Sequence, residues 1–256
     1  MIRIDDDTNA LEVIEGTQAA GHPPGCDPET GKFRADPIGT YSGIYTEAFP
    51  LIPESEWIDR IKTMTANGGF IGQRWQPDPK AHYQNGYPIC WAYSGCQSIE
   101  AAMIGQGAQF VQLSPESLLG VCGNKMVGFY IDRAMAWAKE HGIAERRLVP
   151  QYKNNERDWS PEWKQNAINY RPLESWDCDG RDMKAQLVTA LLCGCGGWGG
   201  LNWAGHAVYF DGLVLDGNKI GVHTPNSHGP GKDWTLFGAK AIPDELIIIR
   251  SVTFSG

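Results

Sequence analysis

The chain lacks long apolar runs. None of its 256 residues lies in a stretch approaching the about 18 to 20 apolar residues that cross a bilayer, and its start, MIRIDDD, lacks the apolar core of a secretory signal peptide. We therefore expect a soluble protein that is located in the cytoplasm and has no membrane partner.

Positive charge is also scarce. The chain holds 22 Lys and Arg against 30 Asp and Glu, which gives a formal net charge of -8. A surface of this sign repels phosphate backbones and anionic headgroups. The composition therefore argues against a nucleic acid as a partner.

Cysteine is too sparse for a dense disulfide framework. The seven cysteines leave at least one thiol free or paired outside the chain, and a reducing compartment is the simpler interpretation. Cys193 and Cys195, even with His206, are a weak zinc signal because no second spaced pair follows. The glycine-rich run 194–200 lacks the strand-turn-helix context of a phosphate-binding loop. We expect neither a metal ion nor a cofactor.

Internal repeats and low-complexity tracts are absent, but the residue composition changes along the chain. The first fifty residues are rich in turn formers, as at 21–28, and predict an extended arm. A short helix is expected near 52–58, with Ser55 as its cap. We therefore divide the chain into an N-terminal arm, 1–83, and a domain, 84–256.

Apolar periodicity predicts helices in the first part of this domain. One helix is expected to begin near Cys90 and to end at Gly105, because apolar residues recur every three or four positions. Ser114, a cap followed by proline and glutamate, begins a second, short helix. A third helix begins at Ile131 and is closed by Gly142. The apolar positions of the first helix are Ala92, Cys96, Ile99 and Met103.

The later part of the domain changes to short runs of Val, Ile, Tyr and Phe. After a helix that follows Asp182, strands are expected at 206–215, 219–224 and 246–254. Residues 216–218, Asp-Gly-Asn, form the hairpin turn between the first two strands.

Helices followed by strands predict an α+β protein without a parallel βαβ sheet. A helical lobe over about 84–155 and an antiparallel β lobe over about 175–256 would leave a cleft between them. The polar, tryptophan-bearing stretch 156–176 is interpreted as the bridge between the lobes.

Cys90 is the candidate for covalent chemistry. A cysteine is a strong nucleophile as its thiolate, which a helix N-terminus or a cationic neighbour stabilises. Because Cys90 lies where a helix is expected to begin, the positive helix end favours the sulfur anion, and an imidazolium from elsewhere in the chain would complete an ion pair.

Five motifs around this cysteine resemble the papain-like cysteine peptidases. Residues 84–94, QNGYPICWAYS, are similar to the family's glutamine, five residues and Cys-Trp-Ala-aromatic-Ser. Residues 113–119 and 138–143 resemble its "LS-x-x-x-L" and "A-x-x-x-G-I" segments, and 205–208 and 225–229 its histidine and "NSWG" motifs. The motifs follow the family's order and cover roughly residues 84 to 240.

The resemblance implies a papain-like two-lobe fold and a role for each of four residues. Cys90 would be the nucleophile, His206 its base, Asn226 the group that orients the imidazole, and Gln84 an oxyanion donor beside the Cys90 N–H. The implied substrate is a peptide or protein.

The chain also departs from the family's pattern. His228 stands where the family usually has a tryptophan that shields the histidine-asparagine bond. Tyr87 replaces a cysteine of the usual disulfide frame, and Pro88 replaces a glycine near the substrate backbone. The arm, 1–83, does not show the long amphipathic helices of an inhibitory propeptide.

Several alternatives stay open. An isolated cysteine at a helix start is more often structural, and His223 and His228 are rival bases by composition. A catalytically weak papain fold could serve as a structural module with an assembly partner on the arm. A vague resemblance to papain-like proteins of tailed bacteriophages suggests a virion location. A cell-wall amidase of the cysteine-histidine type is the third possibility.

Overall fold

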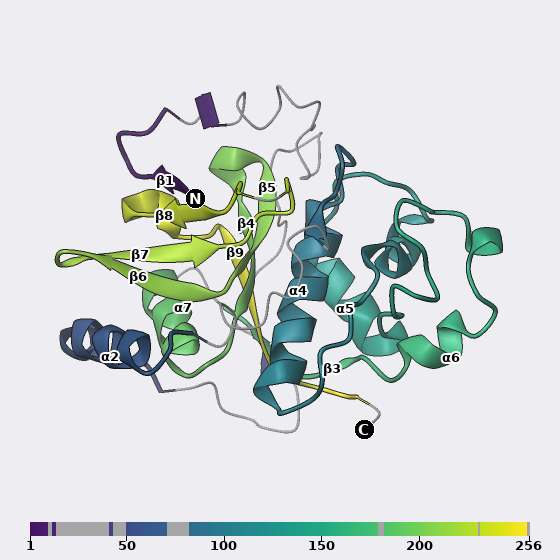
Figure 1. The fold of residues 1–256 in the computed structure, drawn as a ribbon, viewed down its shortest axis with the longest axis horizontal. Coiled ribbons are helices and arrows are strands. Elements are labelled where there is room, and N and C mark those ends of the chain that lie inside the picture. Colours follow the sequence, from purple (N-terminus) through teal and green to yellow (C-terminus); the bar gives the residue numbers. More distant parts are fainter. Residues whose placement is uncertain are drawn as a thin grey trace.

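Helix α4 (Cys90–Gly105) lies between the helical half and the β half of the molecule (Figure 1). This computed structural model describes residues 1–9, 12–13, 41–42, 50–70, 82–178, 182–229 and 231–254. Residues 90–103 of α4 are all buried, the polar Gln97 and the acidic Glu100 included, because the helix packs against both halves. Gly95 has no side chain where Trp198 packs, since a Cβ there would lie 2.7 Å from the indole ring. The helix therefore contacts the sheet closely.

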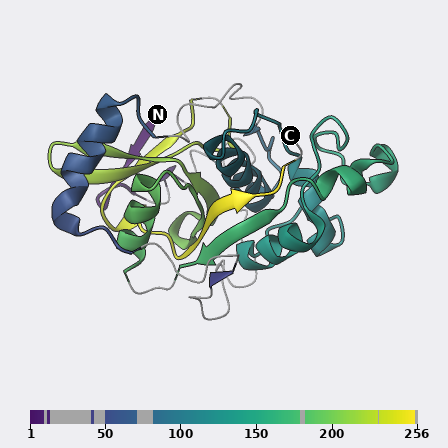
Figure 2. The ribbon, with the colours of Figure 1, turned by 90° about the horizontal axis from the view of Figure 1, so that it is seen from below.

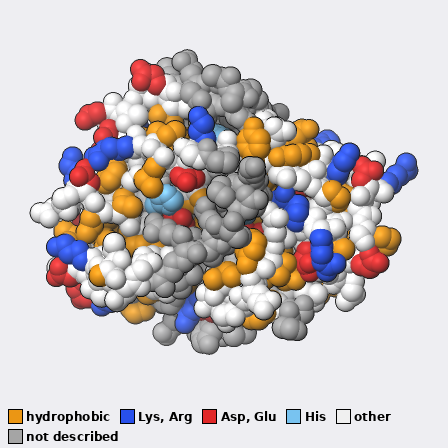
Figure 3. Space-filling model, in the orientation of Figure 1, with side chains coloured by type: hydrophobic (Ala, Val, Ile, Leu, Met, Phe, Trp, Pro, Cys, Tyr) orange, Lys and Arg blue, Asp and Glu red, His pale blue; other side chains and the backbone are white. Residues whose placement is uncertain are grey.

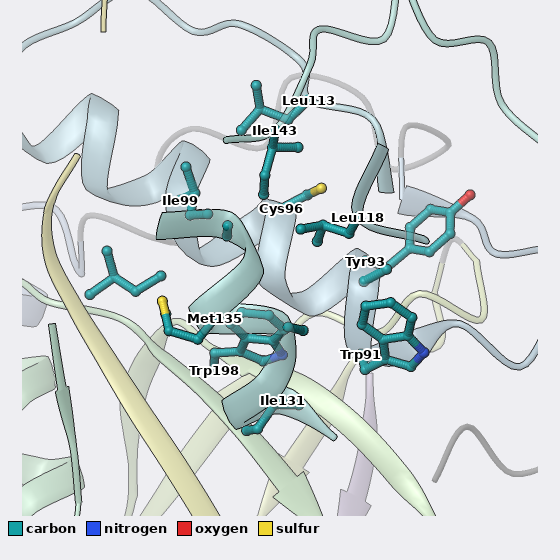
Figure 4. Packing of buried hydrophobic residues seen from close by; sticks show 14 of the residues in the cluster. Trp91, Tyr93, Cys96, Ile99, Leu113, Leu118, Ile131, Met135, Ile143 and Trp198 are labelled. Atoms are coloured by element: carbon teal, nitrogen blue, oxygen red, sulfur yellow. The ribbon is translucent and has the colours of Figure 1, made fainter. Parts of the chain in front are cut away.

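The helical half packs against the other side of α4. Its elements are η2 (Pro115–Cys122), α5 (Ile131–His141), η3 (Glu156–Asp158) and α6 (Trp163–Ala167). Figure 4 shows side chains of α4, α5 and the β-half residue Trp198 meeting in one core. The predicted helix at Ile131 is confirmed, with Gly142 at its end in a positive-φ conformation. The Ser114 prediction was partly wrong: the element is a 3-10 helix, and the Ser114 hydroxyl bonds the Glu116 carboxylate instead of capping it.

The β half contains two sheets among the described residues. The five-stranded sheet has the order β2 (Tyr41–Ser42), β3 (Pro172–Asp177), β9 (Glu245–Val252), β4 (Gly197–Leu201), β5 (His206–Phe210). The four-stranded sheet has the order β1 (Ile2–Ile4), β8 (Trp234–Leu236), β7 (Lys219–Thr224), β6 (Gly212–Asp216). Short 3-10 turns η4 (Asn202–Ala204) and η5 (Gly238–Ala241) join strands. All described pairs are antiparallel except β1 with β8, which is parallel.

The predicted strands were right in place but incomplete. The stretch 206–215 is two strands that separate at Asp211 and belong to different sheets, and β3, β4 and β8 were missed. The supposed bridge at 156–176 holds η3, α6 and most of β3. Strand β4 is rich in glycine because a Cβ at Gly199 would lie 2.4 Å from the Phe210 ring. Close packing, and not strand propensity, selects those residues.

Two helices cover the β half on the side away from α5 (Figure 2). Helix α2 (Glu54–Ala66) packs against α7 (Met183–Leu192) and buries Trp57 and Ile61. The helix expected near 52–58 is therefore longer than predicted, and its cap was wrong: Pro53 precedes the first turn and Ser55 lies inside it. Helix α7 confirms the prediction after Asp182.

Described parts of the predicted arm contribute to the core of the β half. Ile4, Trp57, Ile61 and Phe70 are buried in the same apolar cluster as strands β5 and β9. The turn-rich stretch 21–28 lies outside the described residues. The division at residue 83 stays a prediction.

Charged side chains of both signs are interspersed on the face shown in Figure 3, with apolar groups between them. Among the described residues, no helix has the length and apolar character to cross a bilayer.

Candidate active site

Cys90 is the first residue of α4 and is fully buried. Asn85 and Gly86 adopt positive φ and turn the chain from Gln84 towards the helix start. The Cys90 sulfur accepts a hydrogen bond from the Ala207 N–H at 3.3 Å. The start of α4 therefore lies against the start of β5, in agreement with the sequence prediction that Cys90 begins a helix.

His206 is the first residue of β5. The chain leaves β4 at Leu201, passes through η4 and turns at Gly205, whose φ is +56°. Leu201 and His206 then face each other in the antiparallel register. This tight connection places His206 directly before Ala207, the residue whose backbone N–H contacts the Cys90 sulfur.

Asn226 follows β7 and binds the His206 ring. The His206 Nε2 and the Asn226 Oδ1 are 3.0 Å apart, and both side chains are buried. Because an amide oxygen only accepts, Nε2 carries the proton, and Nδ1 is the nitrogen that can take or return another. The backbone N–H of Asn226 donates to Asp233 Oδ1 at 3.2 Å, which holds the segment in place.

Gln84 joins the segment before α4 to the segment after β7. Its backbone N–H donates to the Ser227 carbonyl at 2.8 Å, and its Oε1 accepts from the Ser227 hydroxyl at 2.5 Å. Its Nε2 donates one hydrogen to the Tyr87 carbonyl at 2.7 Å. The amide is fully buried in a fixed orientation, and the geometry leaves its second Nε2 hydrogen for another acceptor.

His228 covers the His206 ring. The two ring centroids are 4.3 Å apart with an interplanar angle of 34°, and the His228 N–H donates to Asn226 Oδ1 at 3.2 Å. Trp234 contacts both imidazoles edge-on, at 5.4 Å from His206 and 6.4 Å from His228.

The four predicted site residues come together through these contacts: Gln84 with Ser227, Asn226 with His206, and Cys90 with the residue after His206. Their catalytic roles and the cleft between the halves stay predictions.

The rival base His223 has a different partner. Its Nδ1 lies 2.6 Å from Asp211 Oδ1, and both groups are buried. Among the described residues, no group of three or more His, Cys, Asp or Glu side chains is arranged to hold a metal ion.

Two tyrosine rings stack near the start of α4. Tyr87 stacks on Tyr152 with ring centroids 5.6 Å apart, and Cys122 is a free thiol. Together these two aromatic rings pack the loop before α4.

Sequence reasoning missed the groups that hold the site together. Ser227 and Asp233 were not identified, although Ser227 belongs to the motif that resembles "NSWG". The sequence contained no signal for the pairing of Asp233 with the Asn226 backbone, because that contact depends on the loop's fold.

Comparisons with known proteins give relatives by structure alone. No family model and no curated protein matches the chain. The ragweed pollen cysteine protease Amb a 11, in its proform, is similar with a TM-score of 0.62 and 15% identity, over 98% of this chain and 79% of that one. In another crystal structure of the same proform, the match spans 61% of that chain, with a TM-score of 0.53.

Two procathepsins are similar to a comparable degree. Procathepsin B S9 of Trypanosoma congolense has a TM-score of 0.57 at 15% identity, over 84% of this chain and 87% of that one. Procathepsin L2 from the larval midgut of Tenebrio molitor has a TM-score of 0.59 at 15% identity, over 93% and 80%. Identity this low shows the fold and not the activity. The chain has a papain-like α+β fold, with η2 and α5 on one side of α4 and largely antiparallel sheets on the other.

Proposed function

We propose that this protein is a cysteine peptidase that hydrolyses peptide bonds with Cys90, His206 and Asn226, and with Gln84 beside the oxyanion. One observation carries the proposal: the His206 ring is held by Asn226 at 3.0 Å, while the next residue's N–H contacts the Cys90 sulfur at 3.3 Å. A thiol at a helix start, an imidazole and an orienting amide are the parts of a nucleophile-base pair.

In the proposed acylation step, His206 takes the Cys90 proton and the sulfur attacks the carbonyl carbon of the substrate. A carbon-sulfur bond forms, and the carbonyl electrons move to oxygen. When the carbonyl reforms, the carbon-nitrogen bond breaks and the amine leaves with the proton from His206. Water, deprotonated by His206, then attacks the acyl-enzyme and releases the acid and the free thiol.

Gln84 and the helix start would stabilise the developing oxyanion. Gln84 is fixed by Ser227 and Tyr87, so its remaining Nε2 hydrogen needs no reorganisation during the reaction. Cys90 is the first residue of α4, where N–H groups point out of the helix start. These donors would act together with the positive helix end.

The decisive test is Cys90→Ala with Cys96→Ala as the matched control. Both cysteines lie on α4 and are buried, but burial raises the pKa of the Cys96 thiol. Hydrolysis of a fluorogenic peptide panel, measured with a thiol reductant, should be lost in Cys90→Ala and kept in Cys96→Ala. Epoxide-type thiol inhibitors should label Cys90, as mapped by mass spectrometry. Unchanged hydrolysis in Cys90→Ala would rule out this nucleophile.

A structural module with a papain fold is the second candidate, because His228 replaces the shielding tryptophan expected from the resemblance. That candidate requires a wild type without hydrolysis and with no selective labelling of Cys90, together with an assembly through the N-terminal residues that cross-linking would detect. A loss of turbidity in purified peptidoglycan would instead favour the amidase. The bacteriophage origin and virion location suggested by sequence have no support from the structural neighbours and are not included in the proposal.

A further inference from the structure

His228 lies where it can change the charge next to His206. The two imidazoles overlap with ring centroids 4.3 Å apart and planes inclined by 34°. The His206 ring is buried, whereas His228 is partly exposed. The His228 backbone N–H also donates to Asn226 Oδ1, the same oxygen that the His206 Nε2 contacts.

The described groups near His228 and its neighbours come from several elements. Cys90 comes from the start of α4, and Asp233 lies beyond Asn226, whose N–H its carboxylate accepts. Trp234 of β8 is uncharged, and the neutral Tyr83 ring lies next to Gly229. His206 is the ionisable side chain whose ring stacks on that of His228.

We propose that His228 is a positioning residue that makes the reactivity of Cys90 sensitive to acid. The inference rests on the proposed function and extends it to regulation of the same site. Neutral His228 stacks on the His206 ring and leaves the Cys90 thiolate and His206 imidazolium paired. Protonated His228 places a second positive charge against the imidazolium.

The proton balance follows from these positions. With His228 charged, His206 returns its proton to the Cys90 sulfur, which leaves a neutral thiol, a neutral His206 ring and one imidazolium on His228. The sulfur is then a weaker nucleophile, although no group has left the site. Two unit charges at this separation repel enough to move a titration by about one to two pH units.

The experiment compares the rate of Cys90 alkylation by iodoacetamide between pH 4 and 9 in wild type, His228→Phe and His228→Trp. The phenylalanine keeps an aromatic ring but cannot take a proton. Both variants should keep reacting to lower pH, with the acid midpoint about one unit below that of wild type. At pH 5 the wild-type rate, relative to its own plateau, should be about tenfold lower than that of His228→Phe.

His141→Gln is the control, since His141 is exposed at the end of α5 and should leave the profile unchanged. Circular dichroism checks that each variant is folded. Histidine ring-proton NMR of the wild type is a readout that needs no variant: the His206 and His228 signals should titrate as a coupled pair.

Alkylation separates the two proposals because it needs no substrate. Retained hydrolysis in Cys90→Ala contradicts the proposed function. Equal acid midpoints in wild type, His228→Phe and His228→Trp, or independent titration of the two rings, overturns the role of His228 even where Cys90 is the nucleophile.

Discussion

Two buried histidines of the β half have different partners. His206, at the start of β5, binds the neutral amide of Asn226 at 3.0 Å. His223, in β7, binds the carboxylate of Asp211 at 2.6 Å. Both lie within one packed region, since β5 and β7 contact each other.

The partner decides what each ring can do. Burial lowers the pKa of His223, but the hydrogen bond and charge of Asp211 outweigh it and raise that pKa. Burial raises the pKa of Asp211 more than the ring lowers it. Both directions mean that the pair retains a proton, so His223 is a poor general base. An amide adds no charge, and therefore His206 can gain a proton and release it again.

The largest difference between the two histidines should appear when each ring is removed in turn. His206→Ala should lower kcat/KM at least about a thousandfold because the general base is lost, with a small change in the free energy of unfolding. His223→Ala should do the reverse: it leaves the buried Asp211 charge without its partner and costs about 3 kcal/mol of stability. Peptide hydrolysis and urea unfolding measure the two effects.

Matched conservative variants complete this test. His206→Gln and His223→Gln keep a polar side chain of similar size at each position. If His223→Gln lost hydrolysis while remaining folded, the separation between the two histidines would be wrong.

A smaller effect on rate is expected at Gln84. Gln84→Ala should lower kcat about a hundredfold with little change in KM, because an oxyanion donor acts mainly in the transition state. Ser227→Ala keeps the Gln84 amide but removes the hydroxyl that holds the amide oxygen at 2.5 Å. It should therefore lower kcat only about tenfold. Steady-state kinetics on a peptide substrate give the ratio. Equal losses would mean that Gln84 serves the loop and not the oxyanion.

The site was predictable from sequence where its parts are local. The start of a helix at Cys90 follows from apolar periodicity, and the turn before β7 follows from Asp216, Gly217 and Asn218. Motif order then indicated Gln84 and Asn226, which the structure brings near His206.

Contacts between distant segments could not be predicted in this way. Strand β1 pairs with β8 across more than two hundred residues, and Gly199 of β4 leaves room for the Phe210 ring. Helix α2 has no side-chain cap and follows Pro53. The prediction of Ser55 as a serine cap therefore misplaced the first turn of this helix. In each case tertiary packing decided the outcome over local propensity.

The smallest expected effect is on the pH dependence of stability, which His223 should influence through its raised pKa. The pKa of His223 is raised above its ordinary 6.5, so its contribution to stability is complete below about pH 6.5 and is lost as pH rises through the raised value. Glu100 of α4 acts in the same direction: burial raises its pKa from the ordinary 4.5 to about 8, so its contribution to stability is complete below about pH 4.5 and is lost as pH rises to about 8. The wild type should therefore lose stability as pH rises from about 4.5 to 8 because of Glu100, and above about pH 6.5 because of His223. Asp211→Asn removes the charge that raises the His223 pKa. In urea unfolding it should flatten the part of the pH dependence of stability that comes from His223. Glu100→Gln should remove only the part that comes from Glu100. An unchanged slope in Asp211→Asn would mean that the pair does not retain its proton, and the contrast with His206 would then rest on geometry alone.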